Sequence, residues 1–201
     1  MIVRRVVNTV FKSCSYLLIE NDCTWMVDCG DVDRLLPMVE GRLCGVLLTH
    51  AHFDHIYGLN TLLAIYPALS VMTCEVGLSG LLNDKLIFSR YYGEPFVFNF
   101  ADNVRLVTDG QRLSLFDDTD AVAVFTPGHS PDCITWIVGE SLFTGDSFIP
   151  GVKTVTNIPH SDKAMAARSE ILIRELSLAR TVYPGHAPAS DNEEILMTNT
   201  I

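Results

Sequence analysis

The sequence lacks a long apolar run, and no stretch reaches the ~20 consecutive apolar residues that a membrane-spanning helix needs. It is also poor in basic residues, because 14 lysines and arginines stand against 24 aspartates and glutamates, for a formal net charge of -10. Nucleic acids and anionic membranes are bound through clusters of lysine and arginine. We therefore expect neither as a partner and expect a small-molecule substrate, while a homodimer is left open.

No Cys-x-x-Cys pair occurs among the six cysteines, and most of them lie inside apolar segments. This pattern is typical of small buried thiols in a reducing compartment. Residues 2–7 carry a basic pair but no long apolar segment of the kind found in signal peptides, and they are expected to form a strand. We therefore expect a cytoplasmic protein without disulfides. The cysteines are Cys14, Cys23, Cys29, Cys44, Cys74 and Cys133.

No linker, repeat or low-complexity segment interrupts the 201 residues, which we interpret as a single domain spanning 1–201. Helices are expected at 32–39, 54–65, 75–92 and 162–178, with a short polar helix after residue 183. Strands are expected at 2–7, 15–20, 24–28, 43–48, 70–73, 104–107, 112–115, 121–125, 134–138, 141–143 and 181–183. Two strand-rich halves, each followed by helices, predict a β-sandwich covered by helices.

Five of the six histidines stand next to a turn that closes an apolar strand. His50 and His52 belong to an H-x-H-x-D-H run that also contains Asp54 and His55. The later members of the set each follow a predicted strand: His129 in Pro-Gly-His-Ser, Asp146 in Thr-Gly-Asp and His186 in Pro-Gly-His. These seven imidazoles and carboxylates would meet along one edge of the sandwich.

Side chains at positions i and i+2 of an extended segment project to the same side, so His50 and His52 can face one cation. Asp54 and His55 point elsewhere as the chain turns into a helix, and can reach a second cation. His129 would complete the first site, His186 the second, and Asp146 would bridge them. Imidazole and carboxylate suit Zn²⁺, Fe²⁺ or Mn²⁺, and the ligand type alone does not choose among these metals.

Together these motifs resemble those of the metallo-β-lactamase superfamily, and within it the glyoxalase II-like hydrolases. The resemblance covers nearly the whole chain and includes Val27-Asp28-Cys29-Gly30 in addition to the histidine and aspartate motifs. It implies an α+β fold, a four-layer αβ/βα sandwich of two mixed sheets flanked by helices. It also implies a dinuclear site with His50, His52 and His129 on one metal, Asp54, His55 and His186 on the other, and Asp146 between them.

Five further residues are candidates for roles around the site. Asp28 is either a residue of a strand-ending turn or an acceptor that orients the metal-binding loop through backbone or imidazole. Tyr91 and Tyr92 could form a pocket wall or lid, although aromatic packing explains them nearly as well. Lys153 could neutralise a substrate carboxylate or lie on the surface, and His160 could contact substrate or be a solvated loop residue.

The expected activity is hydrolysis of a small thioester or ester by metal-activated hydroxide, by analogy with glyoxalase II. Two divalent ions are expected as cofactors, with zinc preferred and iron or manganese as alternatives, and Asp54 could also accept a proton from the nucleophile. Alternatives are a lactone or phosphodiester hydrolase, or a mononuclear iron dioxygenase acting on persulfides. His52 fills the position that flavodiiron proteins fill with glutamate, which favours hydrolysis over oxygen chemistry.

Overall fold

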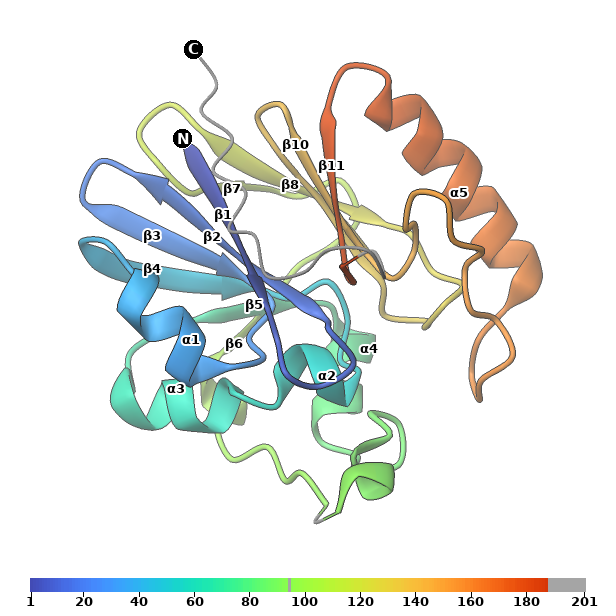
Figure 1. The fold of residues 1–201 in the computed structure, drawn as a ribbon, viewed down its shortest axis with the longest axis horizontal. Coiled ribbons are helices and arrows are strands. Elements are labelled where there is room, and N and C mark those ends of the chain that lie inside the picture. The colour runs from blue at the N-terminus through green and yellow to red at the C-terminus, as the bar shows by residue number, and fades with distance from the viewer. Residues whose placement is uncertain (94, 188–201) are drawn as a thin grey trace.

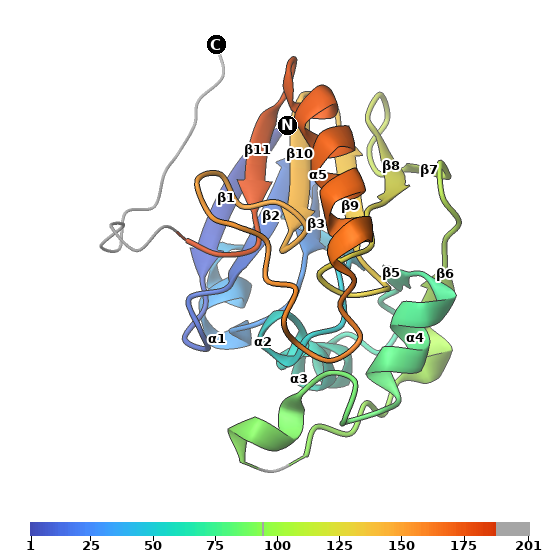
Figure 2. The same cartoon turned by 90° about the vertical axis from the view of Figure 1, so that its right-hand side faces the viewer.

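Two β-sheets lie face to face, and helices cover the outer face of each (Figures 1 and 2). The computed structural model describes residues 1–93 and 95–187, although the side chain of Tyr92 is outside the described part. The helices are α1 (Val32–Leu35), α2 (Phe53–Ile56), α3 (Leu59–Ile65), α4 (Glu75–Leu81) and α5 (Lys163–Ser177). Short 3₁₀ helices occupy Leu36–Met38 (η1), Ser89–Tyr92 (η2) and Ala101–Asn103 (η3).

Each sheet combines antiparallel and parallel strand pairs. In the first sheet, in the order β1-β2-β3-β4-β5-β6, the first three strands are antiparallel and the remaining pairs are parallel. Its strands are β1 (Ile2–Val7), β2 (Cys14–Glu20), β3 (Cys23–Val27), β4 (Arg42–Leu47), β5 (Val71–Thr73) and β6 (Val104–Leu106). The second sheet has the order β11-β10-β9-β8-β7, and only β10 and β11 are parallel. Its strands are β7 (Arg112–Ser114), β8 (Asp120–Phe125), β9 (Ile134–Val138), β10 (Ser141–Gly145) and β11 (Thr181–Pro184).

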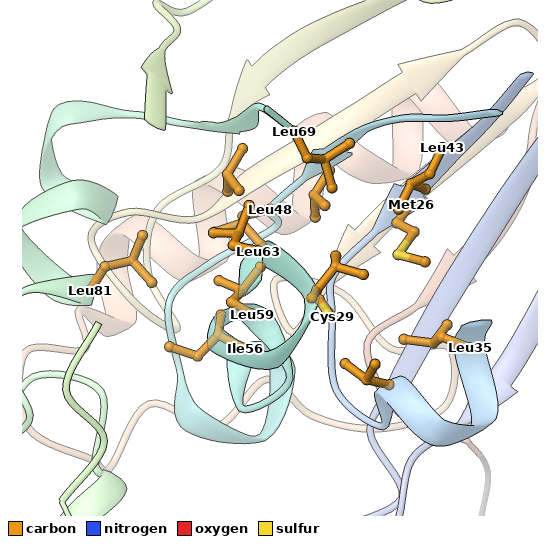
Figure 3. Packing of buried hydrophobic residues seen from close by; sticks show 14 of the residues in the cluster. Met26, Cys29, Leu35, Leu43, Leu48, Ile56, Leu59, Leu63, Leu69 and Leu81 are labelled. Carbon is orange, nitrogen blue, oxygen red and sulfur yellow. The ribbon is translucent and has the colours of Figure 1, made fainter. Parts of the chain in front are cut away.

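Three hydrophobic clusters fill the three interfaces between the four layers. One joins the first sheet to α1 and α3, one lies between the sheets, and one joins the second sheet to α5. Strand β2 is apolar along almost its whole length because both of its faces are buried. Leu17 faces the helices, whereas Leu18 faces the other sheet. Figure 3 shows Leu59 and Leu63 of α3 in the first of these clusters. The expected four-layer α+β sandwich of two mixed sheets is therefore confirmed.

Two expected helices are interrupted. The helix predicted at 54–65 is divided into α2 and α3, because the amide of Gly58 donates to the carbonyl of Cys29 at 3.0 Å and leaves the helical pattern. The helix predicted at 75–92 ends at Leu81, and η2 forms only after a turn. The side chain of Asn83 accepts the amide of Lys85 at 3.1 Å in that turn, and such local bonds compete with helix formation.

The expectation that all six cysteines are reduced is wrong, because Cys23 and Cys44 form a disulfide. Strands β3 and β4 pair in parallel, but the register shifts so that Thr24 faces Leu43 and Trp25 faces Gly45. Cys44 is the extra residue of this bulge, and its Cα lies 6.1 Å from that of Cys23. Such a pairing depends on the register between two parallel strands, so residue spacing in the sequence carried no signal of it.

Thiol titration of the denatured protein should therefore find four free thiols before reduction and six afterwards. The four remaining cysteines are buried and unpaired, at positions Cys14, Cys29, Cys74 and Cys133. Cys23→Ser provides the control, since it should yield five free thiols whether or not a reductant is present. A count of six in the untreated wild-type chain would contradict the disulfide.

No helix in residues 1–93 and 95–187 is both long enough and apolar enough to cross a membrane. The short polar helix expected after residue 183 falls largely within 188–201, outside the described residues. The loops that follow β4, β8, β10 and β11 lie at the end of the sandwich where α2 is found (Figure 1). All seven predicted metal ligands belong to these loops or to α2.

Candidate metal centre

The seven predicted ligands come together from both halves of the sandwich. The segment after β4 brings His50, His52, Asp54 and His55, whereas the loops of the second sheet bring His129, Asp146 and His186. Their ligand atoms fall into three overlapping groups, each with all atoms within 4.8 Å of one another. The groups are His50 with His52 and His129; His50 with His55 and Asp146; and Asp54 with His55 and His186.

Asp28 fixes the orientation of two of the imidazole rings. One of its carboxylate oxygens accepts the backbone amide of Thr49 at 2.7 Å, and the other accepts the Thr49 hydroxyl at 2.7 Å and Nδ1–H of His55 at 2.9 Å. Because the Thr49 hydroxyl donates to Asp28, its oxygen accepts Nδ1–H of His50 at 3.0 Å. In both rings Nδ1 therefore carries a proton, and Nε2 is the nitrogen that faces the site and can bind a cation when it is deprotonated.

Two histidines on the opposite side of the site are held in the same tautomer by backbone carbonyls. Nδ1–H of His129 donates to the carbonyl of Val155 at 3.0 Å, and Nδ1–H of His186 donates to the carbonyl of Phe11 at 3.0 Å. Nε2 of His129 then accepts a hydrogen bond from Nδ1–H of His52 at 2.9 Å. Four imidazoles thus have one nitrogen tied outward by a hydrogen bond and the other nitrogen directed into the site.

Three buried atoms that face the centre lack a hydrogen-bond partner in the described part of the protein. Nε2 of His50, Nε2 of His55 and Oδ1 of Asp146 are buried and have no hydrogen-bond partner there. An unsatisfied buried polar atom costs free energy, and three of them converging on one point indicate a cation as the missing partner. The residues present therefore fit a metal centre.

Asp146 lies between the group of His50, His52 and His129 and the group of Asp54, His55 and His186. Its Oδ2 is 3.5 Å from Nε2 of His129 in one group and 3.2 Å from Nε2 of His186 in the other. Its Oδ1 lies 3.6 Å from Nε2 of His55. The carboxylate of Asp146 therefore lies within 3.6 Å of imidazole nitrogens from both groups.

Electrostatics within the site also favour bound positive charge. Burial alone would raise the pKa of Asp146, but the imidazoles of His186 and His55 lower it well below its ordinary value. Burial acts to lower the pKa of His55, yet Asp54, Asp146 and Asp28 together raise it well above the usual range. The buried carboxylates therefore demand a counter-charge, which a proton or a metal cation can provide. By contrast, burial and then repulsion from His129 lower the pKa of His52 to about 3, so that ring stays neutral.

A cavity of about 520 Å³ opens over the centre and is lined by five of the seven predicted ligands and by Tyr91. Among the other predicted substrate contacts, Lys153 lies on the surface and does not line this cavity in the described structure. His160 lines a separate, smaller cavity of about 150 Å³ beside His52. Tyr92 ends η2, but its side chain is outside the described part.

The sequence reasoning missed Asp132, which is fully buried beside the first group of ligands. Its carboxylate accepts the backbone amide of Ala51 at 2.8 Å, between His50 and His52, and also accepts the hydroxyl of Ser130. It therefore ties the loop after β4 to the loop after β8. A carboxylate three residues after His129, in a short connection between apolar strands, was the only signal available in the sequence.

Gly185 allows the last ligand loop to approach Asp146. A Cβ at this position would lie 2.1 Å from Oδ1 of Asp146 and 2.7 Å from the backbone carbon of Gly145. We expect Gly185→Ala to displace the carboxylate, to lower metal content and to destabilise the fold by about 1–3 kcal/mol. Elemental analysis and thermal unfolding would measure the two effects.

Gly139→Ala is the matched control for that variant. Gly139 has a φ of +57°, but a Cβ added there would meet no neighbouring atom within 4 Å, so alanine should cost only about 1–2 kcal/mol of backbone strain. It should keep a wild-type metal content. The steric argument for Gly185 would be contradicted if the two alanine variants retained metal equally well.

Comparison with known proteins agrees with this geometry. The family model for the metallo-beta-lactamase superfamily matches residues 9–186. A hydroxyacylglutathione hydrolase from Hydrogenovibrio crunogenus is 27% identical over 81% of this chain and 53% of its own length. The probable polyketide biosynthesis zinc-dependent hydrolase PksB from Bacillus subtilis is 26% identical over 83% of this chain and 65% of its own. This chain therefore matches 53% of the length of the first relative and 65% of the length of the second.

The fold is also found in a protein of similar length. The crystal structure of the B3 metallo-beta-lactamase BLEG-1 superposes with a TM-score of 0.83, covering 92% of each chain at 24% sequence identity. At that identity the likeness establishes the fold alone. Together with the family match over residues 9–186 and the converging histidines and aspartates, it shows that the chain belongs to the metallo-beta-lactamase superfamily.

Proposed function

We propose that this protein is a hydrolase that holds two divalent metal ions and cleaves a small thioester or ester. One observation carries the proposal: four imidazoles are held by hydrogen bonds at Nδ1, and their Nε2 atoms converge near the carboxylate of Asp146 beneath an open cavity. His50, His52 and His129 would hold one ion, Asp54, His55 and His186 the other, and Asp146 both. When bound, such ions lower the pKa of water and polarise a carbonyl oxygen.

Residues of the chain would accept the proton released in the reaction and hold the ligands in position. Asp54 lines the cavity, and burial raises its pKa, so it is suited to accept a proton from the attacking water. Its Oδ2 is 3.3 Å from Nε2 of His186, so the carboxylate lies next to the other proposed ligands of the second ion. The hydrogen bonds of Asp28 to Thr49 and His55 hold the ligand loop in place. Since Asp28 is buried and does not line the cavity, a bound substrate would not compete for these hydrogen bonds.

The names of the relatives support this reaction class. One relative is named for a hydroxyacylglutathione, which is a thioester, and the other is named as a zinc-dependent hydrolase. We therefore propose zinc as the preferred metal, with iron and manganese as the alternatives. A mononuclear iron dioxygenase is the competing function, but it leaves the group of Asp54, His55 and His186 without a cation.

Metal analysis combined with a substrate panel tests the proposal. The protein, purified without chelators and then reconstituted with zinc, manganese or iron, should bind close to two ions per chain. It should hydrolyse a chromogenic thioester or ester faster than a lactone or a phosphodiester, without consuming oxygen. A stoichiometry that stays at or below one ion under metal-replete conditions, or turnover that requires oxygen and iron, would overturn the dinuclear hydrolase.

A further inference from the structure

The cavity over the metal centre has an apolar wall. Thirteen residues line it, and five of these are the proposed ligands His52, Asp54, His129, Asp146 and His186. The other eight are all aromatic or aliphatic: Phe11, Phe53, Ile87, Phe88, Tyr91, Val155, Ile158 and Pro159. A volume of about 520 Å³ is in the range of pockets for small organic ligands, so this wall is large enough to contact the acyl group of a small substrate.

No lysine or arginine occurs among the described residues that line the cavity. Arg90 is next to the wall residue Tyr91 in the chain, but its guanidinium forms an ion pair with Asp84. Among the described lining residues, the carboxylates Asp54 and Asp146 lie at the metal end. An anionic substituent of a substrate would have to leave water without gaining a cationic side chain, which is unfavourable.

Two of the wall aromatics are held in a backbone conformation that bulky residues rarely adopt. Phe11 and Phe88 have positive φ values of 51° and 63°. Such residues persist where the surrounding structure enforces them, and they gather at functional sites. The carbonyl of Phe11 accepts Nδ1–H of His186, and the ring of Phe88 packs edge-to-face against His52 with centroids 5.0 Å apart.

The contact with His52 extends outward along η2. The ring of Tyr91 lies with its centroid 6.2 Å from that of Phe88, and Tyr91 is 80% exposed at the cavity mouth. The aromatic wall therefore runs from a proposed metal ligand to the solvent. The ring of Phe88 and the backbone of Phe11 contact ligand histidines, so these contacts position the wall next to the proposed metal centre.

We propose that the substrate of this site carries an uncharged, apolar acyl group, aromatic or branched, which packs against Phe11, Phe88 and Tyr91. The inference rests on the proposed thioester or ester hydrolysis and specifies the substrate class for it. An acyl group with a carboxylate is disfavoured by the lack of cationic side chains in the wall. An acetyl group is disfavoured because it would leave most of the wall exposed to water.

Equilibrium binding of hydroxamates to the zinc-loaded protein tests the wall without turnover. Benzohydroxamate, acetohydroxamate and succinic monohydroxamate share one chelating group, so differences among their dissociation constants report the acyl side. Calorimetry should find benzohydroxamate bound at least tenfold more tightly than acetohydroxamate, and succinic monohydroxamate no more tightly than acetohydroxamate. Equal binding of all three, or preference for the anionic compound, would overturn the proposal.

A charge placed on the wall should weaken that selectivity. Tyr91→Lys introduces a cation at the cavity mouth, and Leu178→Lys introduces the same cation at a remote position that is 88% exposed. We expect Tyr91→Lys to reduce the ratio of benzohydroxamate to succinic monohydroxamate affinity by about threefold to tenfold, and Leu178→Lys to leave it unchanged. Equal shifts in both variants, or no shift in Tyr91→Lys, would contradict the role of this wall.

Turnover of matched thioesters separates this inference from the proposed function. N-acetylcysteamine thioesters of benzoic, acetic and succinic acid differ only in the acyl group, and the benzoyl compound should show the highest kcat/KM. If none of them, nor any ester, were hydrolysed by the metal-loaded protein, the proposed function would fail while the hydroxamate series still decided the nature of the wall. If the succinyl thioester were preferred, hydrolysis would stand and the apolar substrate class would be wrong.

Discussion

Asp146→Asn is expected to lower kcat/KM by on the order of 10²-fold or more and to exceed the effect of any single histidine change. The carboxylate of Asp146 lies near imidazoles of both proposed metal sites. Its Oδ2 is 3.5 Å from Nε2 of His129 in the first site and 3.2 Å from Nε2 of His186 in the second, and its Oδ1 is 3.6 Å from Nε2 of His55. Two dications held about 3.5–4 Å apart repel each other, and a shared carboxylate offsets that repulsion. The amide keeps the size and one acceptor oxygen but loses the negative charge.

The measurement compares metal content, melting temperature and turnover for Asp146→Asn, His55→Ala and His186→Ala. The asparagine variant should lose occupancy of at least one site while it remains folded, because the three hydrophobic clusters do not depend on the metals. If it kept both metals and most of its activity while the histidine variants lost theirs, Asp146 would not bridge the two sites.

Asp28→Asn is expected to weaken metal binding by about 10–100-fold although Asp28 is not a proposed ligand. The asparagine oxygen can still accept the amide of Thr49. Its NH₂ group would then face the Thr49 hydroxyl and Nδ1–H of His55, where Asp28 now accepts two hydrogen bonds. We expect the imidazole of His55 to move its proton to Nε2 and so to lose the lone pair that faces the site.

Backbone strain does not complicate this variant. Asp28 has a positive φ of 57°, and asparagine adopts that conformation more readily than most residues. Competition with a chromogenic chelator would measure the affinity of each site, with Asp120→Asn as the control, since the carboxylate of Asp120 forms a solvent-accessible ion pair with Arg112. Unchanged metal affinity in Asp28→Asn would show that the tautomer of His55 does not depend on this carboxylate.

The ligand motifs were readable from the sequence because each combines a local pattern with a strand end. His50 and His52 are two residues apart in an extended segment, and Asp146 follows a fully buried strand, so local rules were enough to suggest their positions. The apolar wall was not predictable, apart from Tyr91. Phe11 and Phe88 are brought to the cavity by left-handed backbone in loops, and no periodicity records that.

Features that depend on register or on long-range pairing were missed for the same reason. Cys23 and Cys44 are joined only because a bulge between two parallel strands brings their Cα atoms to 6.1 Å. Asp132 holds Ala51, which is 81 positions earlier in the chain, and a contact of that kind leaves no local trace. Both were hidden in a single sequence because they follow from tertiary structure and not from the pattern of neighbouring residues.

The division of the ligands between two sheets determines when the site can exist during folding. Nδ1 of His52 and Nε2 of His129 lie 2.9 Å apart although the two residues are 77 positions apart in the chain. Each of the three ligand groups likewise needs a residue from the second half of the chain, so none of them can be completed locally. Loop-closure entropy opposes such distant contacts until both sheets have formed and packed against each other. We therefore expect the proposed metal binding to follow the packing of the two sheets, and a cation present at 100 times its dissociation constant would add about 2.7 kcal/mol to the stability of the folded sandwich. The proposed ions would therefore link the two halves of the chain in addition to their role in the proposed reaction.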